Sequence, residues 1–200
     1  MIREYMKYLD LSSNQGKIDF QKLAKENIDG VILRSTTANG QLDTRLIEYY
    51  NGILHNMSDI EELSVYKFSY AWNYQQARIE AYKCFHALKE KGIHFDYFYL
   101  DLEGHGGRDY QTDEASAVIL AYIDELEARG WRNKLRLYFN YNYAKNIIDK
   151  MWRNIPVWLA RYNKTMGDVS PFNVVLWQYT STGHVDGIST NVDISKGANE

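Results

Sequence analysis

Short runs of β-branched and aromatic residues alternate with longer helical patterns over most of this 200-residue chain. Five such strand–helix pairs follow one another, and three more strand-like runs come after them with only loops between. Strands that alternate with helices pair in parallel and form an α/β fold. Eight strands are enough to close a barrel, and an open doubly wound sheet is the alternative. No G-x-G-x-x-G motif follows the first strand, which disfavours a dinucleotide-binding fold.

The boundaries come from periodicity and from capping residues. Strands are expected at 5–11, 31–34, 63–68, 95–102, 135–140, 156–161, 173–179 and 191–195. Helices are expected from near Asp19, over 46–54, and at 75–91, 112–129 and 143–151. Asp19 is a plausible N-cap, because its carboxylate can accept the free amides of a first turn. Gly92 and Gly130 are suited to end the third and fourth helices.

Composition narrows the classes of protein that remain. The absence of linkers and composition breaks predicts one domain over 1–200, and we expect a monomer. A net charge of −3 argues against a nucleic-acid partner. Apolar runs are shorter than the roughly 20 residues that span a bilayer, so no membrane partner is expected. Cys84 is the single cysteine and the histidines lack metal-binding spacing, so we expect neither a metal nor a cofactor.

The first ten residues contain no apolar segment of the kind found in signal peptides. The sequence therefore predicts either release of the phage type or a secreted protein that has been trimmed.

Acidic residues close several of the predicted strands. In parallel barrels the reacting groups stand at the C-terminal ends of the strands. Asp10 ends the first strand, Asp101 and Glu103 the fourth, and Asp193 lies on the eighth. Neighbouring carboxylates repel one another, so a purely structural role would require a partner for each.

The step D-L-E at 101–103 is the most informative of these. Residues two apart on a strand face the same side, so Asp101 and Glu103 are expected to face the barrel mouth while Leu102 packs outward. Glycoside hydrolysis needs a proton donor and a second group that stabilises positive charge at the anomeric carbon. A neighbouring carboxylate favours the protonated form of its partner. The alternative is a chance pair of solvated acids.

Aromatic residues gather at the same predicted strand ends, in a chain with seventeen Tyr and five Trp. A groove lined in this way suits stacking against sugar rings. For Trp158 and Trp177 the alternative is that they are barrel core. The candidates for substrate binding are Tyr66, Tyr70, Tyr138, Trp158, Trp177 and Tyr179, together with Arg34 at the end of the second strand.

Taken in order, these motifs resemble the family 25 glycoside hydrolases, the Chalaropsis-type N-acetylmuramidases of bacteria, fungi and phage endolysins. The resemblance runs nearly end to end. It is carried by L-D-L-S-S-N-Q-G-K-I-D-F at 9–20, V-I-L-R at 31–34, Y-K-F-S-Y-A at 66–71, L-D-L-E at 100–103, Y-F-N at 138–140, V-W-L-A-R-Y at 157–162, L-W-Q-Y-T-S-T-G at 176–183 and V-D-G-I-S-T-N-V-D at 185–193.

The resemblance implies a (β/α)5β3 barrel that hydrolyses the β-1,4 bond from N-acetylmuramic acid to N-acetylglucosamine in bacterial peptidoglycan, outside the cell. It implies Glu103 as general acid and Asp101 as nucleophile or as the group that orients the substrate's acetamido group. Asp10 and Asp193 match the supporting acids. At the family position of Arg34 we expect a pairing with one of these acids.

Two residues depart from the family pattern. Asn14 stands where Trp is usual, and Lys67 stands where His is common, which would put a cation close to the acids. The rival functions are a catalytically inactive barrel that binds peptidoglycan or sugar, and a peptidoglycan amidase or peptidase. The second would need zinc or a reactive cysteine, for which the chain offers no motif.

Overall fold

The computed structural model describes residues 5–197, which form a closed barrel whose strands follow one another in chain order. The strands are β1 (Lys7–Leu11), β2 (Gly30–Arg34), β3 (Glu62–Phe68), β4 (Phe98–Asp101), β5 (Leu135–Asn140), β6 (Val157–Ala160), β7 (Val174–Gly183) and β8 (Val192–Gly197). Neighbours from β1 to β7 pair in parallel, whereas β8 runs antiparallel to both β7 and β1. The expected α/β barrel, with three final strands that no α-helix separates, is confirmed.

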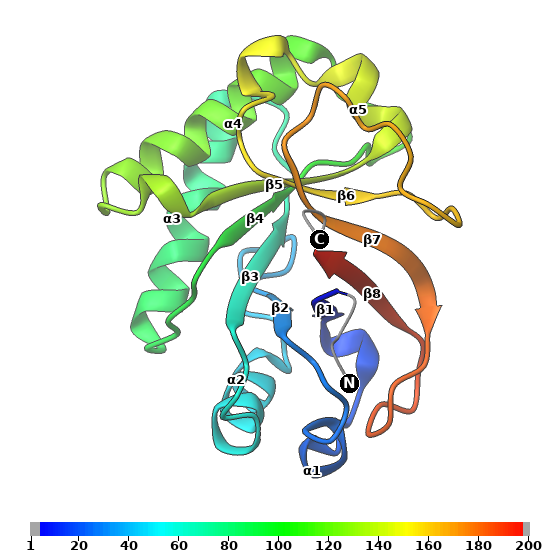
Figure 1. Cartoon of the computed structure of the whole chain (residues 1–200). Helices are drawn as coiled ribbons and strands as arrows, with labels where there is room; N and C mark the ends of the chain where they lie inside the picture. The colour runs from blue at the N-terminus through cyan, green and yellow to red at the C-terminus, as the bar shows by residue number, and fades with distance from the viewer. Residues whose placement is uncertain (1–4, 198–200) are drawn as a thin grey trace.

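The helices surround the barrel over part of its circumference (Figure 1). They are α1 (Phe20–Leu23), α2 (Leu46–Asn56), α3 (Tyr74–Glu90), α4 (Thr112–Glu127) and α5 (Tyr141–Ile147), with single 3-10 turns at Ser13–Gln15, Arg132–Lys134 and Lys150–Trp152. On the right of Figure 1, where β7 and β8 lie, no helix of residues 5–197 covers the barrel. Within that range no helix is both long and apolar enough to cross a bilayer.

The capping residues were predicted correctly. The Asp19 side chain accepts the Lys22 amide at the start of α1. Gly92 and Gly130 follow α3 and α4 with positive φ angles of 65° and 71°, a conformation that glycine adopts without a steric penalty.

Some boundaries differ from those expected. β4 begins at Phe98 rather than at residue 95. The Phe95 ring packs on the Trp131 ring, with centroids 5.4 Å apart, and the Asp96 carboxylate accepts a hydrogen bond from the Leu63 amide, so both side chains are engaged outside the strand. A buried aromatic residue in a turn has the same sequence signature as one in a strand. α5 begins two residues earlier than expected, at Tyr141, and β7 runs on to Gly183 because it continues as an antiparallel pair with β8.

Apolar side chains fill two separate layers. The larger lies between strands and helices and includes Leu33, Leu100 and Phe139. The smaller fills the barrel and is mostly aromatic, consisting of Tyr8, Ile32, Tyr99, Tyr138, Trp158, Ala160 and Leu176. A barrel interior packed in this way is a core and not a channel, so chemistry can occur only at its ends. Gly30 makes room for this core, because a Cβ there would lie 2.2 Å from the Tyr8 ring.

Candidate active site

Four acidic side chains converge where the parallel strands end. Asp10 on β1 and Asp193 on β8 are Cα partners directly across an antiparallel pair. Asp101 is the last residue of β4, and Glu103 follows it by two residues. Side chains that stand directly opposite in antiparallel strands have Cβ atoms about 5 Å apart, so two like charges there repel.

The predicted alternation in D-L-E is confirmed for the strand end. Leu102 is fully buried in the layer between strands and helices. Asp101 has the same parity as Tyr99, which lies in the barrel core, and is itself buried. Asp101 therefore faces inward, and Glu103, which lies past the strand and is half-buried, can reach a molecule bound above it.

Burial raises the pKa values of all four carboxyl groups, and repulsion between carboxylates adds to the rise for Asp10, Asp101 and Glu103. Burial is the largest cause for each. The Asp193 charge is next for Asp10 and for Glu103, and the Glu103 and Asp10 charges raise the pKa of Asp101 well above its usual range. Groups coupled in this way titrate together, so the cluster retains protons at a pH where isolated carboxyl groups would be ionised.

These carboxyl groups have few partners. Within residues 5–197, Asp101 Oδ1 is buried and no hydrogen bond reaches it. Asp193 accepts one bond from Gln178 Nε2 at 3.3 Å, and Asp10 interacts with the Tyr66 hydroxyl. The structure thus supplies too few donors for a purely structural role of these acids.

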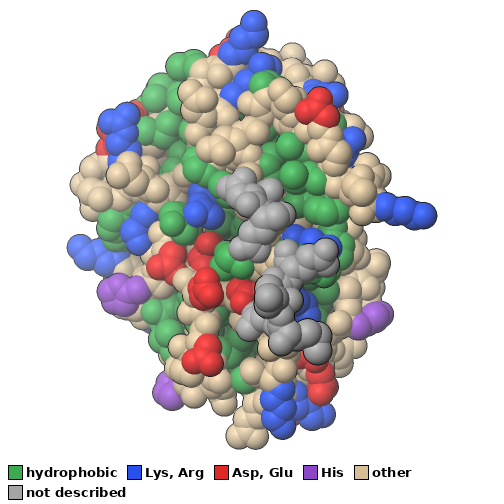
Figure 2. All heavy atoms as spheres, in the orientation of Figure 1, with side chains coloured by type: hydrophobic (Ala, Val, Ile, Leu, Met, Phe, Trp, Pro, Cys, Tyr) green, Lys and Arg blue, Asp and Glu red, His purple; other side chains and the backbone are tan. Residues whose placement is uncertain are grey.

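Acids at the other end of the barrel behave differently. Figure 2 shows that end, where β1 begins and β8 finishes, and acidic side chains gather beside β2 and β3. Asp29 accepts the Lys7 amide at 2.7 Å, Asp96 accepts the Leu63 amide at 2.8 Å, and Glu62 accepts two side-chain hydroxyls. Those acids accept hydrogen bonds from groups at or near the ends of strands, which is a structural role.

Arg34 reaches the same end of the barrel as the four acids but pairs elsewhere. Its Nε donates to Asp43 at 2.6 Å, and its Nη2 donates to the Ser13 hydroxyl. The expected pairing with one of the four acids was therefore wrong. Its charge still acts on Asp10, whose pKa it lowers against the stronger effect of burial.

Three of the expected aromatic residues lie inside the barrel below the acids. The Trp158 ring is 4.4 Å from that of Tyr138 and 6.3 Å from that of Tyr66. Trp158 is only 1% exposed, and its Nε1 donates to Ser195, so it supports the site from the core. The Tyr66 ring, half-buried beside Asp10, is better placed to meet a ligand.

The other aromatic candidates are not brought to this cluster. Trp177 and Tyr179 face the outside of the barrel, where the Lys196 ammonium lies over both rings. Tyr70 lies past the end of β3, is 43% exposed, and contacts Phe68 and His105.

Sequence reasoning missed Gln178 and Tyr162. Gln178 faces inward between Trp177 and Tyr179, and its Oε1 accepts the hydroxyls of Tyr138 at 2.9 Å and Tyr162 at 2.8 Å. Burial raises the pKa of Tyr162, and the charges of Asp193 and Glu103 add to that rise. The alternation applied to D-L-E would have selected Gln178 in W-Q-Y.

Lys67 also points away from the acids. Its side chain is fully buried on the outer side of the barrel, between β3 and α3. Its Nζ lies 3.6 Å from the Glu80 carboxylate on α3 and donates a hydrogen bond to the Phe68 carbonyl. Lys67 is close enough to lower the pKa of Asp101 against burial, in line with the expectation of a cation close to the acids, although its ammonium pairs with Glu80. Asn14, the other departure, is exposed in the turn after β1.

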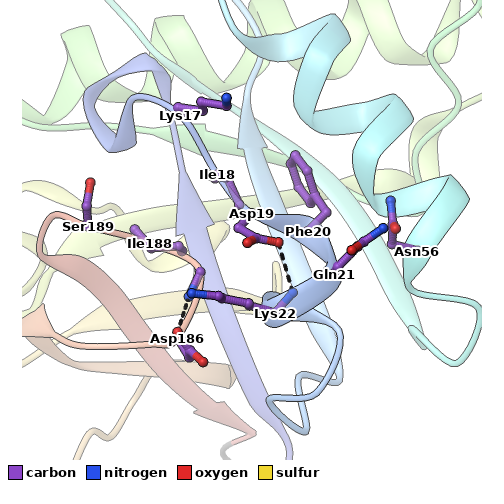
Figure 3. Close-up of a pocket in the computed structure, with 11 residues that line it drawn as sticks. Lys17, Ile18, Asp19, Phe20, Gln21, Lys22, Asn56, Asp186, Ile188 and Ser189 are labelled. Atoms are coloured by element: carbon purple, nitrogen blue, oxygen red, sulfur yellow. Dashed lines mark hydrogen bonds between the residues drawn. The ribbon is translucent and has the colours of Figure 1, made fainter.

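A hollow of 690 Å³ lies on the outer wall where α1 meets the β7–β8 connection (Figure 3). Its acids are Asp19, which caps α1, and Asp186, which accepts the Gly187 amide. None of the four converging acids lines it. Among residues 5–197, no group of three or more His, Cys, Asp or Glu is arranged to hold a metal ion.

Comparisons with known proteins agree with this arrangement. The model of the glycosyl hydrolases family 25 matches residues 9–188. An autolytic lysozyme of Clostridium acetobutylicum is 23% identical over 192 residues, which cover 96% of this chain and 55% of the relative. The chain thus spans about half the length of that curated relative.

Solved structures share the fold. The modular autolysin LytC from Streptococcus pneumoniae, in complex with a synthetic peptidoglycan ligand, superposes with a TM-score of 0.83 at 24% identity, over 96% of this chain and 46% of LytC. The Clostridium perfringens spore cortex lytic enzyme SleM gives 0.84 at 21% identity, over 98% and 68% of the two chains. The catalytic domain of endolysin ply40 from bacteriophage P40 of Listeria monocytogenes gives 0.77 at 23% identity, over 100% and 96%.

Proposed function

The chain belongs to the glycosyl hydrolases family 25, and from that premise we propose that it hydrolyses the β-1,4 bond from N-acetylmuramic acid to N-acetylglucosamine in peptidoglycan. The observation that carries the proposal is the convergence of four carboxyl groups with raised pKa values and few partners at one end of the barrel. The proposal takes the chain as one catalytic domain, active as a monomer on the bacterial cell wall outside the cell.

Glu103 is the proton donor of this proposal. A general acid must be protonated near the working pH, and burial together with the Asp193 charge raises the pKa of Glu103. It is also the more accessible member of the D-L-E pair, so its proton can reach the leaving oxygen. As that proton leaves, the sugar C1–O bond breaks and water supplies the new hydroxyl.

Asp101 assists from below. It is buried, and its Oδ1 has no hydrogen-bond partner within the described chain, so that oxygen is free to accept a bond from substrate or to face the anomeric carbon. Asp10 and Asp193 add negative charge that favours the positive charge developing on the sugar in the transition state. Tyr66 is the aromatic residue best placed to contact the bound sugar.

The bond that is cut can be identified directly. Purified peptidoglycan is digested, the new ends are reduced with borohydride, and the reduced sugar is identified by mass spectrometry. Reduced muramic acid is the expected product. Reduced glucosamine would move the cut to the other bond, and walls of several species left intact would favour the inactive sugar-binding barrel.

The acid assignment is tested by Glu103→Gln, which retains shape and hydrogen bonding but removes the proton donor. We expect cleavage to fall by a factor of about 10² or more, because general acid catalysis contributes about that much. Far-UV circular dichroism and the melting temperature should remain those of a folded barrel. Cleavage at the wild-type rate would remove Glu103 from this role.

A further inference from the structure

A second hollow lies between the loops that follow β2 and β3, at the same end of the barrel as the four acids. It has a volume of 480 Å³. Asn39 and Gly40 come from the first loop, Tyr70 and Trp72 from the second, and Ile79 and Lys83 from α3. We call it the loop pocket. The mechanism proposed above does not use it.

The loop pocket is connected to the acids through aromatic side chains. The Trp72 ring lies 4.0 Å from His105, which follows Glu103 by two residues, and two residues span at most about 7 Å. On the other side, the Tyr70 ring is 4.8 Å from Phe68, the Cα partner of Asp101. The Trp72 and His105 side chains therefore form a continuous surface between this pocket and the loop that carries Glu103.

One wall of the loop pocket is rigid. The Trp72 ring packs against the rings of His105 and Tyr110, with centroids 4.0 and 4.6 Å away, and the Arg108 guanidinium covers it at 3.6 Å. Arg108 is itself engaged, because it makes a two-pronged contact with Glu114 at 2.8 and 2.9 Å. Arg108 therefore fixes the position of Trp72, and because its charge is already paired with Glu114, a charged ligand would bind to another residue.

The charge available to a ligand comes from Lys83. The acid of the pocket, Glu80, is mostly buried and already accepts the Tyr70 amide at 2.9 Å and the Tyr122 hydroxyl at 2.7 Å. Lys83 is exposed, and within residues 5–197 it forms no ion pair. The pocket thus offers one unpaired cation to a ligand.

The remaining surface combines apolar side chains with the exposed amide side chains of Asn39 and Gln76. Ile79 is 57% exposed and Tyr70 is 43% exposed, and both line the pocket beside the Lys83 ammonium. Apolar side chains, one cation and two amides fit a short peptide, whose aliphatic side chains, carboxylate and backbone each find a matching group there. In peptidoglycan such a peptide is attached to muramic acid, the sugar placed at Glu103 by the proposed function.

We propose that the loop pocket binds the stem peptide of peptidoglycan, with Lys83 pairing to a peptide carboxylate. This inference rests on the proposed function and adds a substrate preference to it. Cleavage is then faster on walls that carry stem peptides than on bare glycan.

The test compares two substrates and two matched variants. The substrates are peptidoglycan with its stem peptides and the same glycan after an amidase has removed them. The variants are Lys83→Glu in the pocket and Lys89→Glu further along α3, also exposed, so both change the net charge equally. Replacing an attraction by a repulsion at an exposed site should raise KM for the peptide-bearing substrate about tenfold, and added salt should reduce the difference.

The expected result is a loss confined to Lys83→Glu acting on peptide-bearing wall, with both variants equal to wild type on bare glycan. Equal losses on both substrates would assign the pocket to the glycan and overturn the proposal, and so would no loss on either. Wild-type protein that cuts neither substrate would instead refute the proposed function. Circular dichroism of both variants verifies that they fold.

Discussion

Asp10 on β1 and Asp193 on β8 lie opposite each other. The negative charge of Asp193 raises the pKa of Asp10, so Asp10 holds its proton more tightly than an isolated carboxyl group would. Single substitutions in this cluster are therefore expected to change both the pH dependence of the proposed cleavage and the stability of the folded barrel.

Asp193→Asn should move the alkaline limb of the pH–activity profile to lower pH. The charge of Asp193 is the one that, after burial, raises the pKa of Glu103. Without it Glu103 loses its proton at a lower pH, and an acid catalyst fails once deprotonated. The measurement is kcat/KM against pH. Asp186→Asn, on the outer wall, is the control and should leave the limb in place. An unmoved limb in Asp193→Asn would contradict the coupling.

Asp101→Asn should stabilise the fold at pH 7 while it reduces activity. The raised pKa means that the folded chain binds this proton more tightly than the unfolded chain does. The free energy of unfolding therefore falls as pH rises from about 4, the unfolded value, through the raised one, and an uncharged side chain avoids that loss. The gain is about 1.4 kcal/mol for each unit of pKa difference.

Thermal melts of this variant and wild type at pH 7 and below pH 4 check the sign, because the difference should vanish where both states are protonated. Asp96→Asn, at the other end of the barrel, should give no gain, since that acid serves the Leu63 amide. A destabilised Asp101→Asn at pH 7 would show that the carboxylate has partners in solution.

At this scale the sequence predicted the acids well because one geometric rule, alternation along a strand, applied to D-L-E. The same rule was not applied to W-Q-Y, where it places Gln178 inside and Trp177 outside. The Arg34–Asp43 pair could not be predicted, because it depends on the path of the loop after β2.

At the scale of elements, the contact between β3 and α3 depends on a buried ion pair. Lys67 is 0% exposed and faces Glu80, which also holds the loop after β3 through the Tyr70 amide. Removing one member of a buried pair leaves the other charge without compensation, which costs more than removing both.

Glu80→Gln should therefore lower the free energy of unfolding by about 3 kcal/mol, and adding Lys67→Met should recover much of that loss. Urea unfolding of both single variants and the double variant measures the coupling. Simple addition of the two single effects would mean that Lys67 and Glu80 do not interact in solution.

Strand and helix existence was predictable from periodicity, but direction was not. A strand has the same alternation whichever way it runs, so the antiparallel course of β8 is invisible in the sequence 191–195. The late start of the strand expected at 95–102 was equally hidden, because Phe95 is a buried aromatic residue in the loop before β4.

At the scale of the whole molecule, the count of eight strands predicted a closed barrel, and a closed barrel limits where a site can lie. A filled aromatic core leaves only the barrel ends for chemistry. The site was predictable as far as it depends on strand ends, namely the four acids. The loop pocket was not, because its walls come from two loops and a helix whose relative positions no local pattern specifies.

The antiparallel course of β8 returns the chain to where it started, and the Gly197 amide donates to the Met6 carbonyl at 3.1 Å. The order of elements along the chain is therefore separable from their arrangement in space. A circular permutant that joins the two ends by a short linker and opens at 91–96, between α3 and β4, should still cut peptidoglycan, with a lower melting temperature. The same linkage opened at 102–111, beside Glu103, should fold less well and lose cleavage. Peptidoglycan digestion assays on both permutants would show whether new chain ends at the end of the barrel away from the four acids leave cleavage intact.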